Sequence, residues 1–277
     1  MSRRDMLKTA TASSLLLAGA GGVVKPAFAD SLQGFDKKAD KGRKRVIRIR
    51  HGNNPPDGRT DTFFYTRGFD SVIRRPFAGE TLEMPDDRVA GVVINGGSQA
   101  LDDFVAYPWL KAEYRLIDEC LKREIPLLGI CMGAQQIALH LGGQVTAHEN
   151  GVREFGYYEI RPTKHAGEFL TKPLLAPQYH WATFSIPNGA TRLASSSLFE
   201  NQAFHYGDKT YGVQFHPDVT IEEFRSWQEE KDRSWWGKPG TQSREEQDRL
   251  MHQADAPLAA WCYGFLERLF GRDGSIS

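Results

Sequence analysis

Two uninterrupted runs of apolar residues, 89–94 and 125–130, dominate the hydrophobic pattern in the first half of the chain. Runs of this length without polar alternation are typical of strands buried on both faces of a parallel sheet. Between them, the apolar positions from Leu110 to Leu121 recur at three- and four-residue intervals, which predicts an amphipathic helix. Another helix is predicted from about residue 132 to 141, where two glycines end it. Strand, helix, strand, helix indicates an α/β fold with an open, largely parallel sheet flanked by helices.

The rest of the chain adds shorter elements around this unit. A short strand is predicted at 46–49, and the segment 145–213 alternates β-like runs with turns. The run 211–216 predicts a strand that returns to the core. Beyond residue 228 the composition becomes charged and polar, and a last helix is predicted between Arg244 and Phe270. We therefore expect a core domain at 45–228 and a C-terminal helical extension at 229–277.

The first 29 residues have the pattern of an export signal. Arg3 and Arg4 precede about 16 small and apolar residues, and Ala27-Phe28-Ala29 matches a cleavage signature. The apolar stretch is shorter than the roughly 20 residues that a membrane-spanning helix needs. The arginine pair resembles the twin-arginine signal. We expect a signal peptide at 1–29 that the export machinery reads, a polar linker at 30–44, and a periplasmic or otherwise extracytoplasmic mature protein without a stable membrane span.

Composition narrows the classes of function. The 35 basic and 35 acidic residues balance, so the chain lacks the basic excess that favours nucleic-acid binding. Three cysteines are too few and too widely spaced for a disulfide framework or a four-cysteine zinc site. We expect no nucleic-acid partner, no metal and no cofactor. Each cysteine is therefore assessed for the reactivity of its own thiol, not as a disulfide partner or a zinc ligand.

Cys131 is such a cysteine, because it lies where the second buried strand meets the following helix. Gly129 and Gly133 flank it two residues away on each side, and a sharp strand-to-helix turn needs small neighbours there. This is the nucleophile-elbow arrangement, with cysteine in place of serine. The N-terminus of a helix also favours a thiolate beside it. A buried structural role is common for a free cysteine, but the paired glycines favour a nucleophile.

A thiolate nucleophile needs a proton shuttle, and among the eight histidines His216 has the most ordered context. It ends a predicted strand, and Pro217 follows it. Asp218 comes two positions later, where its carboxylate could orient the imidazole. The order Cys, His, Asp differs from the nucleophile, acid, histidine order of α/β-hydrolases, and the papain-type signature is absent.

The segments Gly-Ile-Cys-Met-Gly-Ala-Gln at 129–135 and Gly-Val-Gln-Phe-His-Pro-Asp at 212–218 resemble the class I glutamine amidotransferase family. The resemblance covers roughly residues 46–223, includes Asn-Gly-Gly at 95–97, and points in particular to the glutaminase domain of GMP synthases and its stand-alone relatives. It implies a flavodoxin-like fold and hydrolysis of the γ-carboxamide of glutamine to glutamate and ammonia through a cysteine thioester. The implied triad is Cys131, His216 and Asp218, and the implied oxyanion hole is formed by Gly97 and Met132. Further substrate contacts are implied at Gly96, Gln135, Phe155 and Gly156.

Two departures from the family pattern leave alternatives open. Asp218 stands where the family usually has Glu and is one methylene shorter, so we expect a looser hold on His216. His-Trp-Ala-Thr-Phe at 180–184 replaces a fuller His-Trp-His-Gly-Asp segment near the mouth of the site. The tail after the motifs is too short for a synthase domain, so we expect a stand-alone hydrolase with a small-molecule substrate. A hydrolase of other γ-glutamyl amides or peptides, and a non-catalytic binding protein that retains the fold, remain as alternatives.

Overall fold

The structure is a computed structural model that describes residues 42–53, 58–229, 234–272 and 274. The predicted signal peptide at 1–29 and all but the last three residues of the predicted linker lie outside the described residues. The twin-arginine signal and the extracytoplasmic location therefore stay predictions. Within the described part of the chain, no helix combines the length and the hydropathy needed to cross a membrane.

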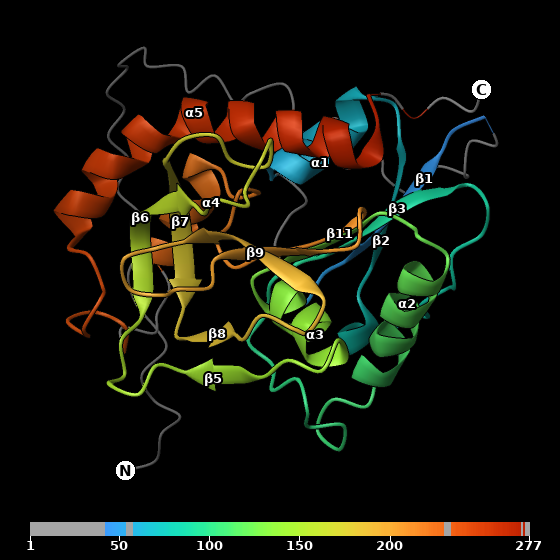
Figure 1. Ribbon diagram of the computed structural model, residues 1–277, viewed down its shortest axis with the longest axis horizontal. Helices are drawn as coiled ribbons and strands as arrows, with labels where there is room; N and C mark the ends of the chain where they lie inside the picture. The colour runs from blue at the N-terminus through green and yellow to red at the C-terminus, as the bar shows by residue number, and fades with distance from the viewer. Residues whose placement is uncertain (1–41, 54–57, 230–233, 273, 275–277) are drawn as a thin grey trace, which may run out of the picture. The chain divides into compact units, whose positions relative to one another are not determined.

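A nine-stranded sheet organises the domain, with the strand order β2-β1-β3-β4-β11-β10-β9-β6-β7 (Figure 1). Its first five strands pair in parallel. They are β2 (Asp70–Arg74), β1 (Arg45–Ile49), β3 (Val89–Ile94), β4 (Leu127–Ile130) and β11 (Thr210–Val213). The predicted α/β fold with a largely parallel sheet is confirmed. Nearly every residue of β3 and β4 is buried, as the apolar runs predicted.

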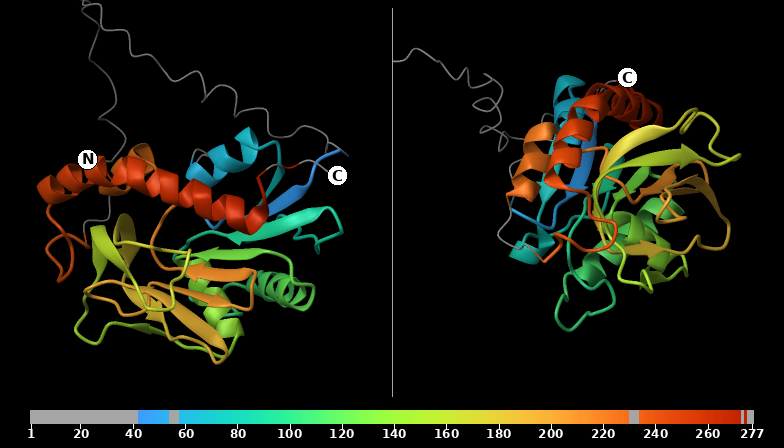
Figure 2. Two further views of the ribbon diagram at one scale, coloured as in Figure 1. Left: turned by 45° about the horizontal axis from the view of Figure 1, so that its top comes forward. Right: turned by 90° about the vertical axis from the view of Figure 1, so that its left-hand side faces the viewer.

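Helices cover both faces of the parallel half because successive side chains along a strand point to opposite faces. Val46 and Val93 face one layer, which is formed by α1 (Arg59–Thr66) and α5 (Arg244–Phe270). Their neighbours Ile47 and Val92 face the other layer, α2 (Leu110–Lys122) and α3 (Met132–His140). Figure 2 shows α5 lying along α1 on the same side of the sheet. The predicted C-terminal helix is thus present and packs into the core.

The remaining strands of the sheet are antiparallel. They are β10 (Ala203–Tyr206), β9 (Ala190–Ser195), β6 (Glu154–Pro162) and β7 (Leu174–His180). A separate antiparallel pair is formed by β5 (Val145–Ala147) and β8 (Ala182–Phe184). A 3-10 turn, η2 (Pro76–Ala78), follows β2, and α4 (Ile221–Gln228) follows β11. The N-terminus of α4 is fixed by a capping box between Thr220 and Glu223.

The strand predicted at 211–216 is shorter in the structure and ends at Val213. After Val213 the backbone leaves the ladder: Gln214 N–H donates to the carbonyl of Gln202 and His216 N–H donates to the carbonyl of Pro177, at 2.8 and 2.9 Å. The segment stays buried although it is not a strand. These hydrogen bonds fix where His216 lies at the carboxyl edge of the sheet.

Candidate active site

Cys131 occupies a sharp turn between β4 and α3. Its backbone has φ 54° and ψ −110°, a conformation that a residue with a side chain rarely adopts. The turn is held from both sides: Cys131 N–H donates to the Val213 carbonyl at 2.7 Å, and its carbonyl accepts from Gln135 N–H at 3.1 Å. Backbone strain of this kind persists only where the surrounding structure enforces it. The arrangement presents the thiol at the edge of the sheet.

The two flanking glycines allow this turn because the backbone segments pack closer than a side chain permits. A Cβ added to Gly129 would lie 2.5 Å from the carbonyl carbon of Gly133. A Cβ added to Gly133 would lie 2.1 Å from the carbonyl oxygen of Ile94, at the end of β3. The spacing of glycines in the sequence thus reflects direct contacts among β3, β4 and α3.

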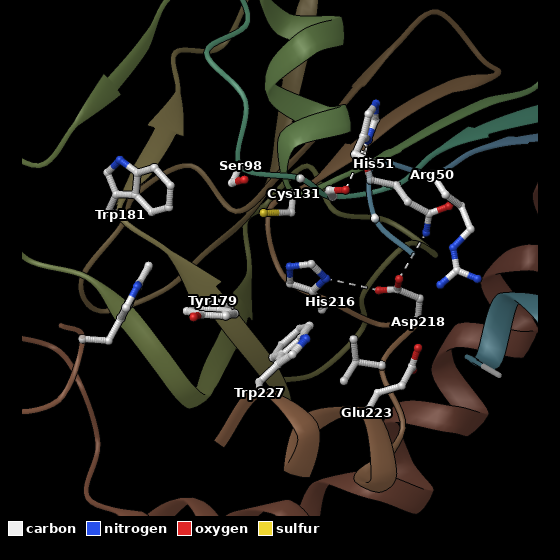
Figure 3. Close-up of a pocket in the computed structure, with 16 residues that line it drawn as sticks. Arg50, His51, Ser98, Cys131, Tyr179, Trp181, His216, Asp218, Glu223 and Trp227 are labelled. Carbon is white, nitrogen blue, oxygen red and sulfur yellow. Dashed lines mark hydrogen bonds and ion pairs between the residues drawn. The ribbon is translucent and has the colours of Figure 1, made fainter. Parts of the chain in front are cut away.

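His216 and Asp218 complete a linear arrangement with Cys131. The imidazole of His216 lies beside Cys131, close enough for the charge of the sulfur to act on it, and its Nδ1 lies 3.4 Å from Oδ1 of Asp218. Figure 3 shows the His216 ring between the sulfur and the carboxylate. Oδ2 of Asp218 also accepts a hydrogen bond from the Asn95 side chain at 3.3 Å. The distance of 3.4 Å exceeds the roughly 2.7–2.9 Å of a charge-assisted hydrogen bond, in line with the shorter side chain of Asp.

The pKa values of His216 and Asp218 are shifted by the neighbouring charges in the site. Burial alone would lower the pKa of His216, but the negative charge of Cys131 and the contact with Asp218 outweigh it and raise this pKa to about 10. Burial alone would raise the pKa of Asp218, but the contact with His216 and the charge of its imidazole outweigh burial and lower this pKa, with a further contribution from Arg50. These surroundings favour the protonated form of the imidazole and the ionised form of the Asp218 carboxylate.

These side chains open into a cavity of about 530 Å³. Its wall includes Gly96 and Gly97, whose backbone passes close to the reacting groups. A Cβ on Gly96 would lie 3.0 Å from Cε1 of His216 and 3.4 Å from Cβ of Cys131. Within the described part of the chain, the N–H of Gly97 donates to no acceptor. The first N–H groups of a helix also lack an intrahelical acceptor, which applies to Met132 at the start of α3.

The other residues implied by the family resemblance lie behind the cavity wall rather than on it. Gln135 donates to the carbonyl of Ala182 at 3.0 Å and to Gln214 at 3.1 Å, and Gln214 in turn donates to Sγ of Cys131 at 3.5 Å. Phe155 packs on Tyr179 with ring centroids 4.7 Å apart, and Gly156 packs against Gln242. Their roles in substrate binding therefore stay predictions.

An aromatic wall, which the sequence did not predict, forms one side of the cavity (Figure 3). It consists of Tyr179, Trp181, Trp227 and Trp235. Their rings contact one another, with centroids 4.5 Å apart for Tyr179 and Trp235 and 5.6 Å for Trp181 and Trp235. Trp227 also contacts the His216 ring at 4.9 Å. Among the described residues, no three or more His, Cys, Asp or Glu side chains form a group that could hold a metal ion.

Comparison with known proteins decides the family. Residues 64–229, more than half of the chain, match the sequence model for Glutamine amidotransferase class-I. The chain belongs to the class I glutamine amidotransferase family. The two motifs that carried the resemblance, around Cys131 and His216, both lie within the matched residues.

Relatives of this amidotransferase differ in how much of their length it covers. It is 32% identical over 155 residues to the glutamine-hydrolyzing GMP synthase of Wigglesworthia glossinidia brevipalpis. The matched region covers 51% of this chain and 28% of the synthase. It thus spans less than a third of the length of that synthase. The glutamine amidotransferase-like protein YfeJ of Salmonella typhimurium is 30% identical over 165 residues, which cover 56% of this chain and 68% of YfeJ.

Solved structures agree with this assignment. A glutamine amidotransferase from Thermotoga maritima superposes with a TM-score of 0.72 and 30% sequence identity. The superposition covers 82% of this chain and 98% of the Thermotoga chain. It therefore extends well beyond residues 64–229, and nearly all of the smaller protein has a counterpart here.

Proposed function

We propose that this amidotransferase hydrolyses the γ-carboxamide of glutamine to glutamate and ammonia, with Cys131, His216 and Asp218 as its triad. The convergence of Cys131 and His216 carries the proposal. They lie 85 residues apart in sequence, yet each follows one of two adjacent parallel strands, β4 and β11. The carboxyl ends of parallel strands share one edge of the sheet, where α/β proteins place their ligands. The two side chains lie side by side there: both line the same cavity, and both lie within 3.4 Å of the position that a Cβ on Gly96 would take.

The chemistry follows from the charges of this pair. The Cys131 thiolate attacks the carbonyl carbon of the side-chain amide, and the carbonyl oxygen becomes an oxyanion that the N–H groups of Gly97 and Met132 face. Protonated His216 gives its proton to the amide nitrogen, the C–N bond breaks, and ammonia leaves a γ-glutamyl thioester. Neutral His216 then takes a proton from water as it attacks the thioester, which releases glutamate and restores the thiolate.

The direct test is incubation of the purified chain with glutamine, followed by measurement of both products. Glutamate and ammonia are expected to form in equal amounts. A folded chain that reacts with a thiol reagent at Cys131, yet releases no ammonia from glutamine or from any other γ-glutamyl amide, would support the binding-protein alternative instead.

Replacing Asp218 by Asn should move the alkaline limit of activity to lower pH. Ammonia can leave only while His216 is protonated, so activity is lost as pH rises through the pKa of His216, about 10 in the wild type. The amide of the variant lacks the negative charge that helps raise this pKa, so the imidazole loses its proton at lower pH. The measurement is a profile of kcat/KM between about pH 6 and 11, a range that brackets the ordinary and the raised pKa of the imidazole.

The matched control for this profile is Asp208→Asn, which removes an exposed carboxylate from the turn between β10 and β11. It should leave the alkaline limit where the wild type has it. An unchanged limit in Asp218→Asn would show that this carboxylate does not act on the imidazole.

A second candidate substrate class, γ-glutamyl amides with an aromatic group on the amide nitrogen, is favoured by the aromatic wall. Glutamine releases only ammonia, which needs no apolar surface. The cavity of about 530 Å³ is within the range of sites for drug-sized ligands, and 43% of the surface of Trp181 is exposed. An aromatic leaving group stacked on this wall would bury that surface.

Trp181→Ala is therefore expected to lower kcat/KM for γ-glutamyl-p-nitroanilide about tenfold, since an aromatic pair contributes about 0.5–1.5 kcal/mol beyond the area that it buries. Turnover of glutamine should change little. Tyr65→Ala is the matched control, because Tyr65 on α1 is 44% exposed and lies outside the cavity wall. Equal losses for both substrates would argue against an aromatic subsite at Trp181.

A further inference from the structure

A buried imidazole–carboxylate pair lies behind the loop at 95–97, and the mechanism above makes no use of it. His51 follows β1, and its Nε2 lies 3.2 and 3.1 Å from the two carboxylate oxygens of Glu113 on α2. Both side chains have no exposed surface. Gln136 on α3 donates to the same carboxylate at 3.0 Å. Burying such a pair costs free energy unless hydrogen bonds offset the loss of water. The contacts of the second ring nitrogen therefore have to be considered as well.

The second ring nitrogen of His51, Nδ1, is hydrogen-bonded to the backbone of the loop at 95–97. Nδ1 lies 3.1 Å from the carbonyl oxygen of Asn95 and 3.2 Å from that of Gly96. Carbonyl oxygens only accept, so Nδ1 carries a hydrogen and donates it. The contact of Nε2 with Glu113 fixes the orientation of the ring. The loop carbonyls are therefore held by an imidazole that is itself held by Glu113.

This contact sets the direction of the neighbouring N–H. No cis peptide bond occurs among the described residues, and in a trans peptide the C=O and the following N–H point to opposite sides. The Gly96 carbonyl points to His51, so the N–H of Gly97 points away from it, toward the side on which Cys131 lies. The loop is packed between these groups: a Cβ on Gly97 would lie 2.8 Å from Cβ of His51, and one on Gly96 would lie 3.4 Å from Cβ of Cys131.

The loop needs such an anchor because its two adjacent glycines have wide conformational freedom and no side chains to restrict them. Figure 3 shows His51 joined to the loop above Cys131. The Asn95 side chain provides a further link, since it donates to Asp218 at 3.3 Å. One short segment thus connects the buried pair to the triad.

We propose that His51, held by Glu113, is a positioning residue that orients the 96–97 peptide so that the N–H of Gly97 meets the oxyanion. The role rests on the proposed function, because an oxyanion forms only if Cys131 attacks an amide. Its contribution is made mainly in the transition state, so its loss should lower kcat with little change in KM.

Two substitutions at His51 separate the contact of this residue with the loop from its contact with Glu113. The amide N–H of His51→Asn is close to the Nδ1 position, so it keeps the donor to the loop and loses the contact with Glu113. The longer side chain of His51→Gln reaches the Nε2 position, so it keeps a donor to Glu113 and loses the one to the loop. We expect kcat for glutamine to fall about 100-fold in His51→Gln, the effect of one oxyanion donor, and only several-fold in His51→Asn.

Two further measurements on the same variants make the result specific. Glutamate γ-semialdehyde, which adds reversibly to a thiolate and forms an oxyanion, should bind His51→Gln about 100-fold more weakly than the wild type, again the effect of one oxyanion donor. Alkylation of Cys131 by iodoacetamide forms no oxyanion and should proceed at the wild-type rate. If His51→Gln does not fold, Glu113→Gln replaces it and should lower kcat several-fold at constant KM.

The outcomes distinguish the two proposals. A wild type that neither hydrolyses glutamine nor binds the semialdehyde overturns the proposed function, and the positioning role with it. An active wild type in which His51→Asn loses as much kcat as His51→Gln, or more, overturns the positioning role alone. Equal kcat for the wild type, His51→Gln and Glu113→Gln also overturns it.

Discussion

Cys131→Ala should lower glutamine turnover by a factor of about 10⁶, because it removes the sulfur atom of the proposed thioester, and triad residues act as a unit. The variant should fold as the wild type does. Alanine keeps the Cβ, so the unusual backbone at φ 54° is no more strained than with cysteine. Steady-state assay of ammonia release gives the rate, and thermal unfolding checks the fold.

Cys120→Ala is the control for loss of a sulfur atom. Cys120 is fully buried on α2, and burial raises its pKa to about 12, as it does for Cys262. Both thiols should stay unreactive at neutral pH, so iodoacetamide should add once to the wild type and not at all to Cys131→Ala. Turnover that survives in Cys131→Ala, or a loss of similar size in Cys120→Ala, would contradict a thioester at Cys131.

Elements with a strong hydrophobic pattern could be predicted closely from the sequence. The apolar run at 89–94 coincides with β3, and the charged and apolar pattern at 244–270 coincides with α5. In both cases burial follows from the pattern itself: β3 is buried in the sheet, and the apolar side chains of α5 face the core. The local pattern of apolar residues was therefore sufficient to predict the bounds of β3 and α5.

Other elements were missed because charged residues are buried in them. Arg59 and Asp61 on α1 are only 5% exposed each, and Asp61 makes an ion pair with the buried Arg48 of β1. A pattern that counts charged residues as exposed cannot identify such a helix. The helix α4 was also not predicted, although Thr220 and Glu223 have the spacing of a capping box. That spacing is sufficient to predict where α4 begins.

The residues of the candidate site also fall into two groups: those that a local sequence motif identifies, and those that only the fold brings together. Cys131 and His216 stand in local motifs, each with glycines or a proline that restrict the backbone, so the sequence alone singles them out. His51 and Glu113 lie 62 residues apart, and nothing near either of them in the sequence indicates that they pair. The aromatic wall likewise draws its rings from β7, α4 and two connecting segments. Only the fold brings such residues together.

Gly133→Ala should destabilise the domain by about 3 kcal/mol and lower its melting temperature by roughly 10 °C. The added Cβ would lie 2.1 Å from the backbone oxygen of Ile94, and a backbone atom in the middle of the sheet cannot move aside. Helix propensity acts in the opposite direction, because Ala is favoured over Gly within a helix by about 0.5–1 kcal/mol. The steric term is the larger one, so the net change should be a loss.

Gly264→Ala tests this balance with the same chemical change. Gly264 lies within α5, and its added Cβ would come no closer than 3.6 Å to another group, an ordinary contact. Helix propensity should then act alone and raise the free energy of unfolding by about 0.5–1 kcal/mol. Opposite signs for the two glycines would support the close packing of α3 on β3 that holds Cys131 at the edge of the sheet. If Gly133→Ala instead melted with or above the wild type, α3 could not lie where the structure places it, and the backbone at Cys131 would lose its support.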